Sequence, residues 1–227
     1  MAYCGEQTLS SGTPERITAI SLRCRAWTCP DCYHDRKRRL MREMSAGQPN
    51  KFITLTMRRV EGMTAEQAAK RLSHAWRLCR LRIIRHAKLK SLPFIAVVEK
   101  HKSGWPHLHI LARMPWFSQK LLSTWMAELC DGPNVWIEHL DKSSKAVSYC
   151  AKYCGKCAQK IGTTKRYWQS RDYDMRSAEE KERFKKQQSV WNKWPATIKR
   201  MAEAYEAWGY HVTWVSGREI HATSNPP

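Results

Sequence analysis

Two histidines separated by a single residue, His107 and His109, have a type and spacing that could support chemistry. In an extended strand successive side chains point to opposite faces, so these two imidazoles share one face. Neutral imidazole is the commonest side-chain ligand for metal ions. The pair is therefore half of a possible metal site, although two partly exposed histidines on an ordinary strand would show the same pattern.

A carboxylate upstream of the histidines could complete such a site. Residues 94–101 and 107–113 are predicted strands, and Gly104 lies in the turn between them, so the two strands form a β-hairpin. If the hairpin pairs positions of equal parity, Glu99 points to the same face as the histidines and supplies an oxygen ligand. Two imidazoles and one carboxylate leave coordination positions open, which suits Mg²⁺, Mn²⁺ or Fe²⁺ acting on a phosphoryl oxygen.

A second group of reactive side chains falls on a predicted helix over about 143–156. Tyr149, Lys152, Tyr153 and Lys156 are three and four residues apart, so they share one helix face. A tyrosine hydroxyl, with a pKa of about 10, becomes a useful nucleophile when a metal activates the phosphorus and a cation stabilises the phenolate. The two lysines could supply that cation, and two tyrosines could attack two phosphates in turn. A solvated helix face with no catalytic role would show the same spacing.

The first 50 residues contain a different candidate site. Cys24, Cys29 and Cys32 have knuckle-like spacing, and Cys4 is the expected fourth thiolate of a structural Zn²⁺. The nine cysteines are odd in number and no secretory signal is visible, which argues against a disulfide framework. The alternatives are ordinary reduced cysteines, His34 as a substitute fourth ligand, or a site that includes Cys154 and Cys157.

Composition limits the class of partner. The chain of 227 residues carries a formal charge of +20, which favours a polyanion, and nucleic acid before an anionic membrane. With 42% hydrophobic and 26% charged residues the chain can bury a core, and no apolar run approaches the roughly 20 residues of a spanning helix. We therefore expect a folded protein of the bacterial cytoplasm that does not bind a membrane.

Basic residues gather in runs that also contain aromatic residues, a composition typical of single-stranded DNA binding. Residues 77–85 and 160–171 are two such runs, with Tyr167, Trp168 and Tyr173 as expected stacking platforms. Any one charge run is also compatible with a solvated surface. The residues expected to contact DNA are Arg36, Lys37, Arg38, Arg39, Lys156, Lys165 and Arg166.

Regular elements must hold these groups in place. A β-branched run over 52–57 predicts a buried strand, and Thr64 can cap a helix whose apolar stripe includes Leu72 and Ile83. With the hairpin, a helix from Ser118 and a strand over 135–140, the order is strand, helix, strand, strand, helix, strand. That order predicts an α+β fold with a ferredoxin-like (split βαβ) antiparallel sheet and helices on one face.

The remainder of the chain is expected to form appendages. We predict a cysteine-rich zinc-binding module over 1–50, a central domain over 51–160, and a basic, mostly helical extension over 161–227. Within the extension we expect a helix with a capping box at Ser177, a helix over 196–208 and a strand over 211–215. Residues 221–227 are expected to be disordered.

Taken together, the central motifs resemble a known superfamily. The run 98–110, which contains Glu99 and the two histidines, and the later run 149–156 resemble the HUH endonucleases, in particular the two-tyrosine rolling-circle replication initiators (Rep proteins) of bacteriophages and plasmids. The run 52–56 resembles their first motif. The resemblance spans about 50–160 and identifies 51–160 as an HUH endonuclease domain.

This resemblance implies roles for particular residues. His107 and His109 would bind a divalent cation, Mg²⁺ or Mn²⁺, with Glu99 as third ligand, while Tyr149 and Tyr153 would be nucleophiles assisted by Lys152. The implied reaction nicks single-stranded DNA at a replication origin through a 5′-phosphotyrosine and later rejoins it. No nucleotide-binding loop follows Gly162, so the expected partners are a host helicase and polymerase.

Two other interpretations are compatible with the same residues. A single-tyrosine transposase of the superfamily shares the order of the motifs, whereas relaxases place their tyrosine before the histidines. A non-catalytic, zinc-containing DNA-binding protein would carry the histidines incidentally. Dependence of strand cleavage on a divalent ion separates an enzyme from a binding protein.

Overall fold

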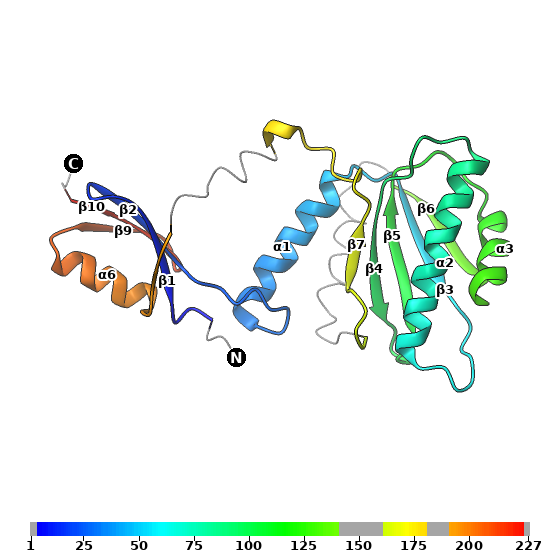
Figure 1. The fold of residues 1–227 in the computed structure, drawn as a ribbon, viewed down its shortest axis with the longest axis horizontal. Coiled ribbons are helices and arrows are strands. Elements are labelled where there is room, and N and C mark those ends of the chain that lie inside the picture. Colours follow the sequence, from blue (N-terminus) through cyan, green and yellow to red (C-terminus); the bar gives the residue numbers. More distant parts are fainter. Residues whose placement is uncertain (1–3, 141–160, 181–190, 225–227) are drawn as a thin grey trace. The chain divides into compact units, whose positions relative to one another are not determined.

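The computed structural model describes residues 4–140, 161–180 and 191–224. Its packing divides the chain into two compact units (Figure 1). We call Asp35–Met175 the histidine unit, and Met1–His34 with Arg176–Pro227 the cysteine unit. Helix α1 (Pro30–Ala46) begins in the cysteine unit and continues into the histidine unit.

The histidine unit contains an antiparallel sheet with strand order β6-β3-β5-β4-β7. The first four of these strands, with two helices between them, have the split βαβ order, so the predicted α+β fold with an antiparallel sheet is confirmed. The predicted elements do not include β7, which extends the sheet at β4. The elements are β3 (Lys51–Thr56), α2 (Ala65–His86), β4 (Phe94–Lys100), β5 (Pro106–Ala112), α3 (Gln119–Cys130), β6 (Asn134–His139) and β7 (Tyr167–Gln169).

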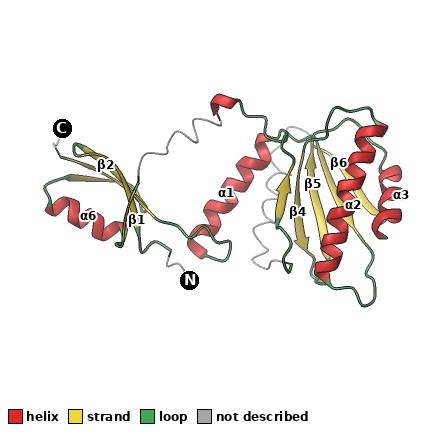
Figure 2. Cartoon of the chain, in the orientation of Figure 1, coloured by secondary structure: helices red, strands yellow, loops and turns green. Residues whose placement is uncertain are grey.

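Helices α2 and α3 cover one face of this sheet, as Figure 2 shows. Helix α2 begins at the predicted cap, where Thr64 and Gln67 form a capping box. Its predicted apolar stripe is buried against Leu108 and Ile110 of β5. Each such aliphatic side chain contributes about 1.5–3 kcal/mol when fully buried, so the stripe fixes which face of the sheet lies under the helices.

The cysteine unit has a second antiparallel sheet, with strand order β8-β1-β2-β10-β9, and α6 packs on one of its faces. Helix α6 and strand β9 agree with the helix predicted over 196–208 and the strand predicted over 211–215. The elements are β1 (Thr8–Thr13), β2 (Arg16–Ser21), β8 (Asn192–Trp194), α6 (Ile198–Ala207), β9 (His211–Ser216) and β10 (Glu219–Thr223).

Two features of this unit bear on the sequence prediction. The prediction that 221–227 are disordered is wrong for His221–Thr223, which belong to β10. Ile220 and Ala222 alternate into the core beneath α6, and that burial orders the strand. The predicted capping box at Ser177 is present, since the backbone N–H of Glu180 donates to its hydroxyl over 3.0 Å. The division into segments 1–50, 51–160 and 161–227 stays a prediction.

Among the described residues, no helix combines the length and apolar character needed to cross a membrane.

The face on which the histidines lie depends on the packing of β5 beneath α2. Leu108→Ala should therefore lower the free energy of unfolding of the histidine unit by about 2–5 kcal/mol, because the cavity it leaves cannot be filled. Urea unfolding of the full chain measures this. The matched control is Leu81→Ala on the exposed side of α2, which should change stability by less than about 0.5 kcal/mol. Equal effects of the two variants would contradict the assigned core.

Candidate active site

Strand β5 places the two histidines on the sheet face opposite α2 and α3. The hairpin register pairs Glu99 with His107, which confirms the predicted pairing of equal parity. On the other side, β3 pairs Thr56 with His107 and Thr54 with His109. Because side chains alternate along each strand, these five residues share one face, which we call the histidine face.

Each imidazole on the histidine face is held at Nδ1 by a threonine of β3. The Thr56 hydroxyl lies 2.9 Å from His107 Nδ1, and the Thr54 hydroxyl lies 3.1 Å from His109 Nδ1. The ring of Phe52 stacks on that of His109 at 5.5 Å between centroids. These contacts orient both rings and leave their Nε2 atoms directed to other partners. Sequence reasoning identified the β3 motif but did not assign this role to its threonines.

The structure brings Glu99 and His109 into direct contact. Glu99 Oε2 lies 2.6 Å from His109 Nε2, and the histidine is 5% exposed. Burial lowers the pKa of His107, and the neighbouring His101 and His109 lower it further against the opposing effect of Glu99. A neutral imidazole retains the lone pair that a metal ion needs, so the residue types on this face are those of a two-histidine, one-carboxylate site.

The separation of these groups decides what they do in this arrangement. The His107 and His109 rings are 6.4 Å apart between centroids, while His101 approaches His107 at 4.8 Å. In the described part of the chain, the cysteines form the only group of three or more His, Cys, Asp or Glu whose ligand atoms all lie within 4.8 Å of one another. The histidine face is thus an ordered donor set in which the two closest ligand atoms are hydrogen-bonded to each other.

The four predicted cysteines lie together in the cysteine unit. Cys4 Sγ and Cys32 Sγ are 3.3 Å apart, and Cys24 Sγ lies 3.7 Å from Cys32 Sγ. Hydrogen bonding, first from the Cys32 backbone, lowers the pKa of Cys29 to about 7, whereas burial raises that of Cys32 to about 12. Four thiol groups in one cluster could bind a metal such as zinc, which prefers tetrahedral thiolate sites. The alternative ligand His34 is not in this group; its ring packs edge-on against Tyr33.

The predicted DNA contacts have mixed surroundings. On α1, Arg38 pairs with Asp35 at 2.5 Å and Arg39 with Glu43 at 2.9 Å, so part of that charge is neutralised locally. Lys165 is exposed, and the Arg166 carbonyl accepts a hydrogen bond from the Val98 N–H.

One predicted stacking platform is wrong. Tyr173 is fully buried, and its hydroxyl donates to the Met44 carbonyl over 2.7 Å, so its ring is not available to a base. Sequence reasoning missed Trp136, which pairs with Thr54 on the histidine face and is 61% exposed. Only the register of β6 reveals its place, because an isolated tryptophan in the sequence predicts burial as readily as a binding role.

The predicted nucleophiles and their neighbouring cations lie outside the described residues. These are Tyr149, Lys152, Tyr153 and Lys156. Their spacing on one predicted helix face is a property of the sequence and stays a prediction.

Comparison with known proteins gives one match. Residues 50–158, just under half of the chain, match the family model of the replication-associated protein ORF2. The match covers all of the histidine face and both candidate tyrosines. No curated protein and no solved structure matches the chain. The family match supports a replication-associated, DNA-binding protein.

The cysteine cluster predicts one zinc ion per chain. Cys24→Ala should remove that ion, measured as zinc per protein after exhaustive dialysis, and should lower the unfolding temperature of the cysteine unit because a structural ion contributes to folding. Cys130→Ala, in the core of the histidine unit, is the control and should retain the zinc. A full complement of zinc in Cys24→Ala would contradict the assignment and favour ligands elsewhere, such as Cys154 and Cys157.

Proposed function

We propose that this protein is a rolling-circle replication initiator that nicks single-stranded DNA at an origin and rejoins it through a 5′-phosphotyrosine. The observation that carries the proposal is the histidine face, where His107, His109 and Glu99 lie together within the range that matches a replication-associated family. Two tyrosines follow these residues in the same matched range.

The donor set on the histidine face suits a hard divalent cation. Two imidazole nitrogens and one carboxylate are ligands that Mg²⁺ or Mn²⁺ accepts while keeping positions open for phosphate oxygens. When bound by His107, His109 and Glu99, the cation would withdraw charge from the scissile phosphate and make its phosphorus more electrophilic.

The threonines of β3 would set the tautomer of both ligands. For Nε2 to bind a cation, the proton of each ring must sit on Nδ1, where Thr54 and Thr56 can accept it as a hydrogen bond. The same tautomer requires that the 2.6 Å contact between His109 and Glu99 opens. Glu99 would then turn its carboxylate from the imidazole to the cation.

The chemical step is an exchange of one phosphodiester for another. The phenolate oxygen of Tyr149 or Tyr153 attacks the phosphorus, and the bond from phosphorus to the 3′ oxygen breaks. The 3′ oxygen leaves with the electron pair and takes up a proton, while the 5′ phosphate stays on the tyrosine. Lys152 would stabilise the phenolate before attack. The reverse reaction, by a 3′-hydroxyl, restores the strand and frees the tyrosine.

The proposal places DNA along the histidine face and extends to partners. Trp136 offers an exposed ring beside Thr54 on which a base near the scissile phosphate could stack. The net charge of +20 supplies the attraction for the phosphate backbone. Unwinding and synthesis would be done by a host helicase and polymerase in the bacterial cytoplasm.

Loss of a metal ligand should separate cleavage from binding. His107→Ala is expected to abolish strand cleavage in Mn²⁺ while leaving the Kd for single-stranded DNA within about threefold, because lysine and arginine contacts to phosphate dominate affinity. Cleavage is followed on denaturing gels and binding by fluorescence anisotropy. His86→Ala, an exposed histidine of α2, is the control and should behave as the unmodified protein. Equal loss of binding and cleavage in His107→Ala would count against a metal role.

The two tyrosines should not be equivalent. Tyr149→Phe and Tyr153→Phe should impair different steps, one the first nick and the other mainly the closing transfer, and the double variant should form no covalent adduct. Tyr210→Phe, in the cysteine unit, is the control and should retain both steps. If one single variant loses all strand transfer and the other loses none, a single-tyrosine transposase becomes the better description. Complete loss in both single variants would contradict alternation.

A further inference from the structure

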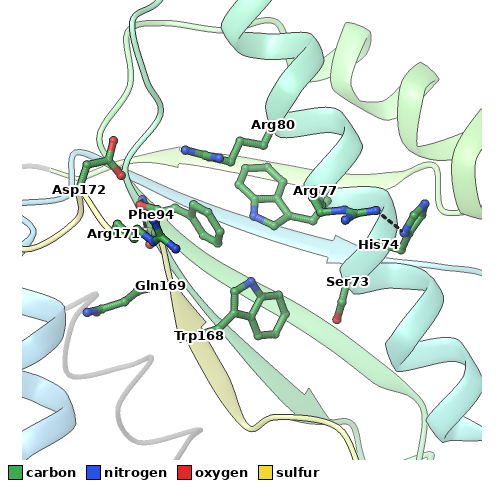
Figure 3. Close-up of a pocket in the computed structure, with 11 residues that line it drawn as sticks. Ser73, His74, Arg77, Arg80, Phe94, Trp168, Gln169, Arg171 and Asp172 are labelled. Carbon is green, nitrogen blue, oxygen red and sulfur yellow. Dashed lines mark hydrogen bonds between the residues drawn. The ribbon is translucent and has the colours of Figure 1, made fainter.

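A pocket of about 690 Å³ lies in the histidine unit between α2 and the end of the sheet formed by β7 (Figure 3). Ser73, His74 and Arg77 line it from α2, and Trp168 and Gln169 line it from β7. These two groups are far apart in the sequence. The structure therefore joins parts of two basic, aromatic runs into one pocket.

This pocket is separate from the histidine face. Strand β7 pairs Trp168 with Ala96, whose side chain lies in the core beneath α2. The preceding residue, Tyr167, pairs with Val97, which lies opposite His109 in the register of β4 and β5. Alternation along β7 thus directs Trp168 to the helix side of the sheet and Tyr167 to the histidine side.

Aromatic rings form much of the pocket. Trp76 and Phe94 are buried and meet edge to face at 5.5 Å, so they are a fixed part of the core. Trp168 is partly exposed, and within the described residues it makes no ring stacking and no hydrogen bond of its indole N–H. Figure 3 shows its ring on the side of the pocket across from Ser73. An accessible indole in this setting is a surface on which a planar group can stack.

Positive charge at the pocket exceeds its negative charge. Arg80 is engaged already: its Nε donates to the Leu92 carbonyl over 2.9 Å, and its guanidinium lies 5.3 Å from the Phe94 ring centroid. Arg77 and Arg171 are exposed and form no ion pair with a described residue; Arg77 contacts only the His74 ring, at 3.2 Å.

The single acidic residue of the lining does not cancel this excess. Burial raises the pKa of Asp172, but hydrogen bonds from Ser170 and Ser91 and the charge of Arg80 outweigh that effect, so the pKa is lowered. Asp172 is therefore an anion matched by Arg80. Arg77 and Arg171 remain as two guanidinium groups available to an anionic ligand.

We propose that this pocket binds one nucleotide of single-stranded DNA outside the segment that is cleaved. The base would stack on Trp168, and the flanking phosphates would contact Arg77 and Arg171, which is the combination that single-strand binding sites use. The inference rests on the proposed function for the identity of the polymer as DNA. It adds a second contact on the other side of the sheet, with β7 as the edge between the two.

The stacking contact is tested by the affinity for fluorescein-labelled oligo(dT) in buffer without added divalent ion, so that no cleavage is needed. Trp168→Ala should raise Kd about tenfold, and Trp168→Phe should stay within about threefold of the unmodified protein because it keeps a stacking ring. Trp116→Ala, an exposed tryptophan elsewhere in the unit, is the matched control. An unchanged Kd in folded Trp168→Ala would overturn the proposal.

The phosphate contacts are tested by salt dependence. Replacing Arg77 and Arg171 together by Gln should reduce the slope of log K against log salt concentration by about 1.4, which is about 0.7 for each lost contact with a single strand. Arg85→Gln together with Arg71→Gln, exposed residues of α2 outside the pocket, should produce a smaller reduction. Equal slopes for the two pairs would contradict a local site.

A covalent readout distinguishes this inference from the proposed function. Oligo(dT) carrying 5-iodouracil should crosslink on irradiation to the tryptic peptide 167–171, which contains Trp168. Free dTMP at the same nucleotide concentration should compete poorly; effective competition would make the pocket a mononucleotide site and overturn the assignment to a DNA strand. Crosslinking without any metal-dependent nicking would sink the proposed function alone, and nicking without this crosslink would sink the pocket alone.

Discussion

The alternation of side chains along β5 is the constraint on which the candidate site depends. Leu108 and Ile110 are drawn into the core beneath α2 and α3, and the residues between and beside them must then face the other way. His107 and His109 consequently meet the threonines of β3 and the carboxylate of β4. A slip of one residue in either pairing would move these groups to the helix side, so the apolar core specifies the register of the polar site.

The same two-sided sheet organises the proposed contacts with DNA. One face carries the donors for a cation and the exposed ring of Trp136, and the other side, at its β7 edge, carries the pocket with Trp168. A strand of DNA that reaches both would pass over β7. Phosphate attraction provides affinity without selectivity, whereas two stacking positions held by one rigid sheet would fix the strand relative to the histidine face.

Much of this architecture could be predicted from the sequence because its signals are local. The apolar stripe of α2, the cap at Thr64 and the alternation around His107 each specify an element from a few neighbouring residues. The sheet of the cysteine unit could not be predicted in the same way. Strand β10 pairs with β2, about 200 residues earlier in the chain, and β1 is rich in Ser and Thr without clear alternation. The pocket with Trp168 also arises from long-range packing, and Tyr173 shows the converse case: it follows a basic run, yet its ring fills space that Gly47 leaves, and its hydroxyl satisfies a buried carbonyl.

The central claim is that a tyrosine of this protein becomes linked to a DNA 5′ phosphate in a metal-dependent reaction. Incubation with a pool of circular single-stranded DNA of random sequence, with and without Mn²⁺, followed by nuclease and trypsin digestion, tests it by mass spectrometry. Tryptic peptides 146–152 and 153–156 hold Tyr149 and Tyr153 separately, so the modified residue is identified directly. The account predicts a nucleotide adduct on one of these peptides only with Mn²⁺. Tight binding by folded, zinc-loaded protein with no adduct in any divalent ion would contradict it.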